Sequence, residues 1–342
     1  MSVQEFYNEL KNLAPYNNQN LEYRDTLSKI LKTYVENLSS IDEDEKIHNW
    51  EKHIRNVDNI VKRLKDIAMA SYKGQPSSAY NKFKYLIKDF SNNLIFTILN
   101  KDTHFYRMRV FEKQRTNITY EDMFHIPINK RRTVKTQRYS TPGYPCLYLG
   151  TSIYSCWEEM CRPFMNNCWV SLLKNTENLN LLDLRFPSEE IFTNNFQKYI
   201  YVFPFIISCM IPVKNVDDIY KPEYIIPQLF IEWIINNENY DGIFYTTSHK
   251  NNDFDYSLRK NENIAIPIKS PLDKAKYCPI LKRMFLITNP ANNEIEQLRD
   301  PYPIDGGDLD ENIQELNYRT SNFGCLEGRL NDNRYYQLHE LP

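Results

Sequence analysis

The sequence predicts an α+β protein in three consecutive parts. Apolar residues recur at helical spacing over residues 1–100, which indicates an all-helical N-terminal domain. Short apolar runs typical of strands begin near residue 101 and continue to residue 270. Residues 271–342 form an acidic, turn-rich extension, in which the stretch 289–312 holds one Arg against seven carboxylates.

Two apolar stripes define the helices expected in the first part. Successive members lie mostly three or four residues apart, so each stripe occupies one helix face. The first stripe consists of Ile47, Trp50, Ile54, Val57, Val61 and Leu64, and the second of Tyr80, Phe83, Ile87, Phe90 and Leu94. Ser40 and Glu43 have the spacing of a capping box just before the first stripe. We expect this part to pack or to contact a partner.

The second part alternates strand-like runs with helical patterns. The strand-like runs span residues 105–111, 146–150, 168–173, 179–185, 241–247 and 263–269. The helical patterns cover residues 152–162 and 225–238. Few of these segments follow a strict strand–helix–strand order, which favours an α+β arrangement.

Composition argues against several classes of protein. The formal net charge of −2 argues against a general nucleic-acid binder, and we interpret the basic stretch 129–138 as a surface loop. The seven Cys residues form no close CxxC pair, which argues against a zinc site or a disulfide framework. The N-terminus lacks the pattern of a signal peptide, and the longest apolar run, residues 199–213, is too short for a membrane span. We therefore expect a cytoplasmic protein without a metal site.

Two arginines project from one face of the first predicted strand of the second part. Arg107 and Arg109 are two residues apart, and side chains at this spacing share a face. Such a pair can bind a diphosphate or a carboxylate pair through bidentate hydrogen bonds, and an edge strand exposed to water is the alternative. Arg138 precedes a Pro-Gly turn that leads into the next strand, a position from which it can reach a cleft.

The stretch YPCLYLGTSIYSCWEEM, residues 144–160, places two adjacent glutamates on the helix that follows a buried strand. On a helical wheel the apolar residues form one buried face, and the two glutamates lie on its opposite flanks. The members of this face are Ile153, Cys156, Trp157, Met160 and Phe164. The wheel alone therefore does not decide whether Glu158 or Glu159 borders a cleft.

A cluster of polar residues ends the predicted strand 241–247. Thr246, Thr247, Ser248 and His249 follow each other there, as ligand-binding groups often do at the end of a strand. Ser248 and His249 point to opposite sides of an extended chain, so they could hardly form a catalytic dyad directly. A plain polar strand end is the alternative.

Taken in order, these segments resemble the RES domain, a toxin domain named for its Arg, Glu and Ser. The family pattern is a Tyr-Arg strand, a GRxNxxGxPxLYLA segment, a helix that ends in TALAE, and a DGIxYPS strand followed by an apolar strand that begins with Asn. The corresponding segments here are FYRMR (105–109), QRYSTPGYPCLYLG (137–150), YSCWEE (154–159), YDGIFYTTS (240–248) and NENIAIPI (261–268). Gln228 also stands where the family tends to carry a Gln. The resemblance covers roughly residues 101–270.

The resemblance implies a core similar to that of ADP-ribosyltransferases, a split antiparallel sheet that holds NAD in a cleft. It assigns the two family arginines to Arg107 and Arg138, the Glu to Glu159 and the Ser to Ser248. Glu159 is then the carboxylate that faces the ribose, and Glu158 is its solvated neighbour.

Four further residues complete the expected NAD site. Ser140 stands where the family has Asn, and Thr247 stands where it has Pro, after the extra residue Thr246. Ser140 then takes over the contact that the family makes with its Asn, and the second difference brings Thr247 close to the ligand. Arg109 supports the diphosphate, and the ring of Tyr148 can stack on nicotinamide.

The resemblance implies a toxin-like enzyme that depletes cellular NAD by cleaving its nicotinamide–ribose bond, with water or phosphate as acceptor. NAD is then a substrate, phosphate a potential co-substrate, and no resident cofactor is expected. The alternatives are a mono-ADP-ribosyltransferase acting on a macromolecule and an inactive module that binds NAD or recruits a partner. We expect an antitoxin or immunity protein, or regulation in cis by the N-terminal helices, and consider a homo-oligomer; neither nucleic acid nor membrane is expected as a partner.

Overall fold

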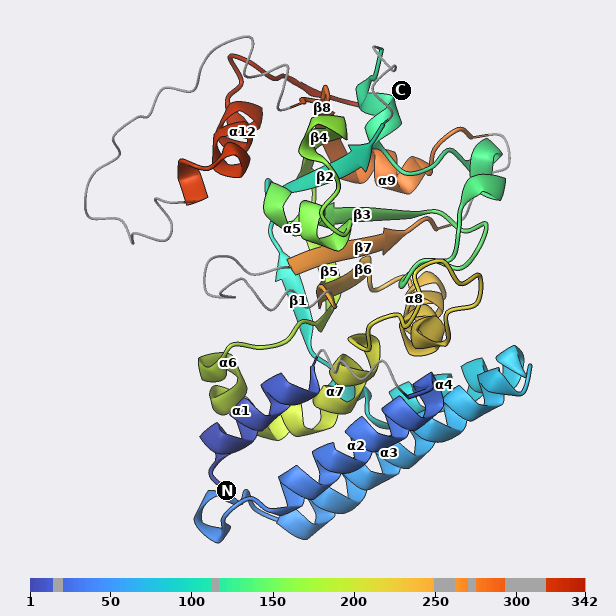
Figure 1. The fold of residues 1–342 in the computed structure, drawn as a ribbon, viewed down its shortest axis with the longest axis vertical. Coiled ribbons are helices and arrows are strands. Elements are labelled where there is room, and N and C mark those ends of the chain that lie inside the picture. The colour runs from blue at the N-terminus through green and yellow to red at the C-terminus, as the bar shows by residue number, and fades with distance from the viewer. Residues whose placement is uncertain (15–20, 112–116, 249–261, 270–274, 293–317, 342) are drawn as a thin grey trace. The chain divides into compact units, whose positions relative to one another are not determined.

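The computed structural model describes residues 1–14, 21–111, 117–248, 262–269, 275–292 and 318–341 (Figure 1). These residues form helices and antiparallel strands, so the predicted α+β class with a helical N-terminal region is confirmed. The likeness to an ADP-ribosyltransferase core stays a prediction. No helix in the described ranges is both long enough and apolar enough to cross a membrane.

The chain divides into two compact units, and each unit combines segments that are far apart in the sequence. Unit 1 consists of Met1–Thr97, Lys135–Pro142 and Leu182–Lys250, and unit 2 consists of Ile98–Val134, Gly143–Leu181 and Asn251–Pro342. The division expected from the sequence lies at residues 100 and 270, in chain order. As a division of function, these three parts stay a prediction.

Unit 1 is mainly helical (Figure 1). Its helices are α1 (Val3–Leu13), α2 (Tyr23–Ser39), α3 (Trp50–Tyr72), α4 (Pro76–Asp89), α6 (Glu189–Asn194), α7 (Phe196–Cys209) and α8 (Ile225–Ile235). Short 3-10 turns are η1 (Glu43–Glu45), η2 (Ser91–Asn93) and η6 (Pro222–Tyr224). The strand β6 (Gly242–Thr246) belongs to this unit, and the boundary between the units falls within β1 (Phe96–Leu99) and β5 (Leu179–Leu184).

Helix α7 provides much of the core of unit 1, and every residue from Tyr199 to Cys209 is buried. Pro204 lies inside this helix and has no N–H to donate to the carbonyl of Ile200, one turn earlier. The hydroxyl of Tyr34 on α2 donates to that carbonyl at 2.8 Å. The second helix of the chain thus satisfies a polar group that the proline leaves without its helical partner.

Aromatic contacts extend this shared core to the other N-terminal helices. Phe6 on α1 lies 6.1 Å from Phe192 on α6, measured between ring centroids. Phe83 on α4 packs edge-on against Phe230 on α8 at 4.8 Å. The first hundred residues therefore share one core with residues 182–250 in unit 1.

The capping box predicted at Ser40 and Glu43 does not form. Ser40 ends α2, Glu43 belongs to the 3-10 turn η1, and α3 begins only at Trp50. A capping box does form at α1, where Ser2 accepts from the N–H of Glu5 and the Glu5 carboxylate accepts from the N–H of Ser2. The spacing alone did not identify the helix start, because a tight turn occupies the same residues.

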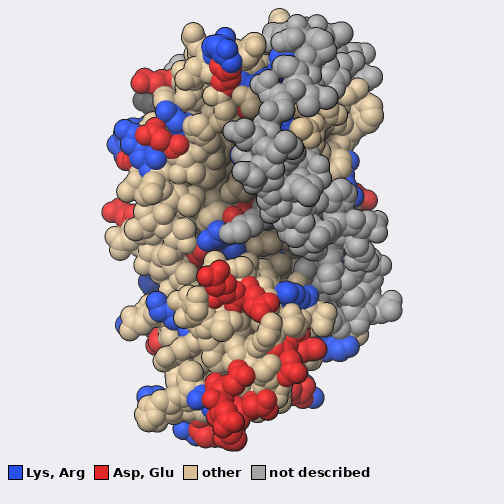
Figure 2. All heavy atoms as spheres, turned by 90° about the vertical axis from the view of Figure 1, so that its left-hand side faces the viewer, with Lys and Arg blue, Asp and Glu red and all other residues tan. Residues whose placement is uncertain are grey.

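Acidic side chains gather near the lower end of the face in Figure 2, at the level where Figure 1 draws α1 and α6. In unit 1, η1 contributes Glu43, Asp44 and Glu45, and the first turn of α6 contributes Glu189 and Glu190. Such a concentration of carboxylates repels phosphate groups, so this part of the surface does not favour nucleic acid.

Unit 2 is built on an antiparallel sheet with the strand order β7-β3-β2-β4-β8-β9. Its strands are β2 (His104–Val110), β3 (Cys146–Gly150), β4 (Cys168–Asn175), β7 (Glu262–Pro267), β8 (Phe285–Thr288) and β9 (Leu338–His339). Its helices are α5 (Ile153–Glu159), α9 (Pro279–Met284) and α12 (Asn322–Asn331), with 3-10 turns η3 (Tyr120–Met123), η4 (Ile128–Thr133) and η5 (Met165–Asn167). Each predicted strand-like run in this unit coincides with a strand.

The sheet opens between β2 and β3. β2 pairs with β4 along its whole length from His104 to Val110, but its pairing with β3 is at Tyr106 and Gly150. A side chain on Gly150 would not fit, because its Cβ would lie 2.7 Å from the sulfur of Cys156. The close approach of α5 to the strands at this point therefore requires glycine.

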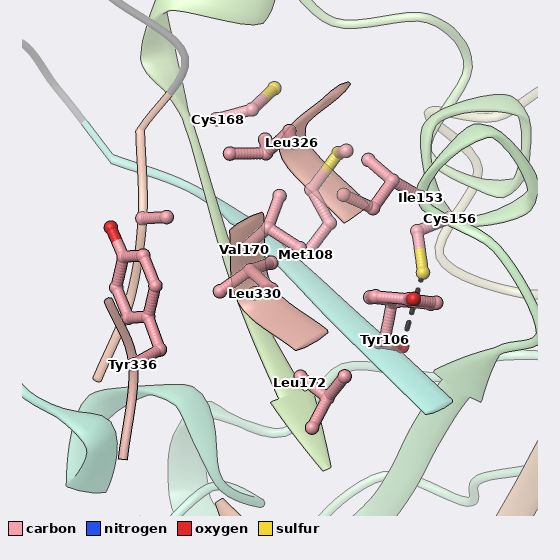
Figure 3. Packing of buried hydrophobic residues seen from close by; sticks show 11 residues of the cluster. Tyr106, Met108, Ile153, Cys156, Cys168, Val170, Leu172, Leu326, Leu330 and Tyr336 are labelled. Carbon is pink, nitrogen blue, oxygen red and sulfur yellow. Dashed lines mark hydrogen bonds between the residues drawn. The ribbon is translucent and has the colours of Figure 1, made fainter. Parts of the chain in front are cut away.

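A cluster of buried side chains holds α5 and α12 against the sheet (Figure 3). Ile153 of α5 and Leu326 of α12 pack with Met108 and Val170 in this cluster. The thiol of Cys156 donates to the carbonyl of Tyr106 at 3.2 Å (Figure 3). The described end of the chain thus contributes to the core of unit 2, although an acidic, turn-rich extension was expected there.

The hydrogen bond between Tyr34 and the Ile200 carbonyl can be tested by a double-mutant cycle. We expect Tyr34→Phe to lower the free energy of unfolding by about 1–3 kcal/mol, because the buried carbonyl loses its donor. In a Pro204→Ala background the backbone N–H of residue 204 can bond that carbonyl, so Tyr34→Phe should then cost about 1 kcal/mol less. Urea denaturation of the four proteins measures the coupling. Equal costs in both backgrounds would show that the proline is not the reason for the contact.

Candidate functional site

The predicted site residues fall into two groups, one in each unit. Unit 1 carries Arg138, Ser140, Thr247 and Ser248, and unit 2 carries Arg107, Arg109, Tyr148 and Glu159. Within the described ranges, no three His, Cys, Asp or Glu side chains are grouped so that they could hold a metal ion.

In unit 1 the structure brings Arg138 and Ser248 together. The guanidinium Nη2 of Arg138 donates to Ser248 Oγ at 2.6 Å. Its Nη1 donates to the carbonyls of Cys209 at 2.7 Å and Ile211 at 3.0 Å, where α7 ends. The partial negative charge at the C-terminal end of a helix favours a cation there. The guanidinium also lies over the ring of Tyr224, 5.2 Å from its centroid.

The charge of Arg138 is enclosed, and the described residues place no opposite charge against it. The residue is 7% exposed, and among the residues that the structure describes no carboxylate contacts its guanidinium. A buried charge is costly unless it is paired or hydrogen-bonded. Here hydrogen bonds to two carbonyls and one hydroxyl satisfy part of the group, so an anionic ligand would find an unpaired cation.

A short turn holds Arg138 in place. Gln137 and Ser140 exchange backbone hydrogen bonds of 3.0 and 3.2 Å across this turn. The side-chain amide of Gln228 on α8 lies 3.0 Å from each of their two carbonyl oxygens and 2.9 Å from Thr136 Oγ1. Gln228 therefore positions the turn that carries Arg138 and the buried Ser140.

The end of β6 supplies the remaining predicted residues of unit 1. Thr246 Oγ1 accepts from the N–H of Phe186 at 3.0 Å, so this hydroxyl is part of the fold. Thr247 and Ser248 are both buried. His249 lies outside the described residues. Since Ser248 accepts from Arg138, its own proton remains able to donate to a ligand.

In unit 2, Arg107 lies in the opening of the sheet. Its Nη1 donates to the carbonyl of Tyr148 on β3 at 2.8 Å, beyond the point where β2 and β3 pair. Its Nε is enclosed and has no hydrogen-bond partner among the residues that the structure describes. Burial and, secondly, the charge of Arg109 lower the pKa of Arg107 to about 10. The electrostatic effect agrees with the prediction that the two arginines share one face of β2.

Ser171 is a polar group beside Arg107 that was not predicted. It stands directly opposite Arg107 in the pairing of β4 with β2, and its buried hydroxyl has no hydrogen-bond partner in the described part of the chain. Directly opposite residues of an antiparallel pair have neighbouring side chains. Two enclosed polar atoms without partners, Arg107 Nε and Ser171 Oγ, therefore lie on adjacent strands and could both bind a ligand or water.

His125 is a buried histidine near Arg107. Its Nε2 accepts from the N–H of Cys278 at 2.9 Å, so the neutral ring carries its proton on Nδ1, which donates to the carbonyl of Ile126 at 2.8 Å. Burial lowers the pKa of His125 to about 4, with a further lowering by the charge of Arg107 and an opposing effect of the bond to Ile126. The ring is thus neutral at physiological pH and does not compete with Arg107 for an anion.

The structure reverses one prediction about α5. Glu158 is 2% exposed, so its interpretation as a solvated neighbour is wrong. Its carboxylate accepts from Arg162 Nε at 2.9 Å and is hydrogen-bonded to Tyr154, which contributes, after burial, to raising the pKa of Tyr154. Glu158 therefore stabilises the end of the helix.

Helix α5 also ends earlier than predicted. Cys161 and Arg162 both have left-handed backbone, with φ of 61° and 55°, so the helix stops at Glu159, before Pro163. Met160 and Phe164, which were expected on the buried face, are 38% and 65% exposed because the helical wheel no longer applies to them.

The roles predicted for Glu159 and Tyr148 stay predictions. Glu159 is the last residue of α5 and is partly buried, and its charge adds to the effect of burial in raising the pKa of Cys161. Tyr148 pairs with Ala265 of β7 and is partly exposed, as a ring that stacks on a ligand must be.

Three contacts of the site were not predicted: Tyr224 under Arg138, and Ser171 and His125 near Arg107. Each comes from a segment distant in the sequence, and none belongs to a motif. Gln228 was noted through the resemblance, but its function in holding the turn became visible only through its hydrogen bonds.

No family model matches the chain, and no solved structure matches it. A protein of Bacillus subtilis (strain 168) with the name "Putative toxin YopC" is 37% identical to this chain over 216 residues. The match covers 58% of this chain and 48% of that protein, so the aligned part spans about half of the length of this relative.

The low pKa of His125 predicts a dependence of stability on pH. The unfolded state takes up a proton near pH 6.5 and the folded state only near pH 4, so the free energy of unfolding falls as the pH is lowered through this window. The loss for this group is about 3.5 kcal/mol at most, since each pKa unit corresponds to about 1.4 kcal/mol. In His125→Gln, whose amide does not titrate, we expect a flatter profile in urea denaturation between pH 6.5 and 4. Identical slopes in both proteins would contradict the buried neutral ring.

Proposed function

We propose that the protein is a toxin-like enzyme that cleaves the nicotinamide–ribose bond of NAD+, with water or phosphate as acceptor. The similarity to a protein whose name calls it a toxin supports the toxin-like part. The ordered resemblance to the RES domain supports NAD as the substrate. The observation that carries the proposal is the enclosed guanidinium of Arg138, which is bonded to Ser248 and lacks a carboxylate contact within the described residues.

An anion with several oxygens suits the surroundings of Arg138. A diphosphate accepts bidentate, charge-assisted hydrogen bonds, which are the strongest that a guanidinium forms. The hydroxyl of Ser248 can donate to the same ligand, because its oxygen already accepts from Arg138. Arg138 and Ser248 therefore offer one cation and one directed hydroxyl to a diphosphate.

Arg107 is a second cation among the predicted residues and Glu159 a carboxylate, and both belong to unit 2. Within the described ranges, Arg107 keeps one enclosed N–H without a partner, and Ser171 opposite it keeps an enclosed hydroxyl. The carboxylate of Glu159 stands at the end of a helix whose termination Glu158 and Arg162 stabilise. We assign to Glu159 the stabilisation of the ribose cation, and to Arg107 the binding of phosphate oxygens.

The reaction needs electrostatic stabilisation more than proton transfer. When the bond from ribose C1′ to the nicotinamide nitrogen breaks, the bonding electrons leave with nicotinamide, which departs as a neutral molecule. The ribose develops oxocarbenium character, and a carboxylate nearby stabilises that positive charge. Water then adds to C1′ and releases a proton, or phosphate adds in its place. No strong general acid is required.

An enzyme that consumes NAD would harm the cell that makes it. We therefore propose that a partner protein of the antitoxin type restrains the activity, as the toxin name of the relative supports. Regulation in cis by the N-terminal helices is less well supported, because these helices share their core with residues 182–250 and do not form a separate unit.

Incubation of the purified chain with NAD tests the proposed activity directly. We expect ADP-ribose and nicotinamide with water alone, and an ADP-ribose phosphate when phosphate is the acceptor, both identified by mass spectrometry. Glu159→Gln should lower kcat by roughly 100-fold or more, because it removes the charge that stabilises the transition state. The exposed Glu177→Gln in the same unit is the matched control and should keep the activity.

Intact NAD in both incubations, with folding verified by circular dichroism, would exclude this function. Label from NAD that accumulates on protein or nucleic acid instead would favour an ADP-ribosyltransferase. Wild-type kcat in Glu159→Gln would show that the carboxylate is assigned to the wrong residue.

Arg138→Lys tests the proposed diphosphate site. Lysine keeps the charge but cannot form the bidentate contact, so we expect KM for NAD to rise by about tenfold or more. Arg132→Lys, at an exposed position six residues earlier, should leave KM unchanged. Thermal denaturation shows whether both variants fold. An unchanged KM in folded Arg138→Lys would mean that this arginine only supports the fold.

A further inference from the structure

A cavity in unit 1 takes no part in the proposed NAD chemistry. It has a volume of 450 Å³ and is lined by residues of α4 and α8 and of the turn that follows α4. The contact between Phe83 and Phe230 holds these two helices together. Small-molecule sites commonly have volumes of about 300–1,000 Å³, so the cavity is large enough for one.

The wall that α4 contributes is positively charged. Lys84 and Lys88 both line the cavity, and residues four apart on a helix are neighbours on one face. In the described part of the chain neither ammonium group forms an ion pair, and the cavity has no acidic lining residue. The nearest acid in the sequence, Asp89, is bound to Arg63 at 2.6 Å. Two free ammonium groups one turn apart can bind the same phosphate.

Aromatic rings and an apolar side chain form the rest of the cavity. Trp233 of α8 and Tyr85 of α4 contribute rings, and the buried Ile87 contributes aliphatic surface. The indole of Trp233 is stacked on Tyr240 at 5.2 Å, and Tyr240 is stacked on Phe96 at 4.2 Å. This series of rings holds the indole in a defined orientation. Tyr85 is 64% exposed, so its ring is accessible to a ligand.

We propose that this cavity binds a small molecule that joins a flat ring to a phosphate, the chemistry of a nucleoside monophosphate. The phosphate lies between Lys84 and Lys88, and the ring stacks on Trp233 and Tyr85. Stacking of a base on an aromatic side chain and charge-assisted bonds to its phosphate act together in such a site. None of these residues belongs to the proposed NAD chemistry, so binding here does not depend on that proposal.

Isothermal titration of the full chain with AMP, adenosine and inorganic phosphate tests the site. We expect AMP to bind at least about tenfold more tightly than either part alone, because only AMP makes both contacts. Lys84→Gln combined with Lys88→Gln should weaken AMP at least about tenfold. The control Lys82→Gln, on the same helix but outside the cavity lining, should bind AMP like the wild type. Tyr85→Ala, at an exposed position, should weaken AMP and leave phosphate binding unchanged.

Three results would overturn the proposal. These are no heat of binding with millimolar AMP, equal affinity for AMP and adenosine, and AMP binding that the double lysine variant leaves unchanged. NAD turnover is measured in the same variants and should stay at the wild-type rate. A protein that binds AMP in this way but leaves NAD intact would retain the cavity site and lose the proposed enzymatic function.

Discussion

The fold of unit 1 depends on a carbonyl group that a proline deprives of its helical partner. Pro204 cannot donate to Ile200, and Tyr34 donates in its place, so α2 is bound to α7 by a hydrogen bond as well as by apolar packing. The far end of α7 then provides the carbonyls that bind Arg138. One helix thus connects the N-terminal part of the chain with Arg138.

Segments with a clear periodic pattern were predictable from the sequence because such a pattern is local. The strand expected at residues 146–150 coincides with β3, and β6 lies within the run 241–247. α7 was not predicted, since its run is apolar on every side and contains a proline, which hides both the helical period and the length. The early end of α5 arises from the left-handed backbone of Cys161 and Arg162, which neither residue type indicates.

Contacts between distant residues were predictable only through the resemblance. It named Arg138 and Ser248, which meet although they are 110 positions apart. It named Glu159 as the residue at the cleft but wrongly placed Glu158 in solvent, because the bond from Arg162 to Glu158 accompanies a backbone conformation of Arg162 that was not predicted. Ser171 and Tyr224 were missed because no motif contains them. Strand pairing brings Ser171 to Arg107, and the folding of a distant segment brings Tyr224 to Arg138.

Unit 1 is assembled from segments that are far apart in the sequence, and this has a consequence for the synthesis of the protein on the ribosome. The apolar faces of α1 to α4 leave the ribosome first, but α7 and α8, against which they pack, follow roughly 100 residues later. At about 5–20 residues per second, these faces remain uncovered for several seconds or longer. During this interval the nascent chain exposes surface that chaperones recognise. A shortened chain that lacks the first hundred residues would have the converse defect, since the buried side chains of α7 would never be covered.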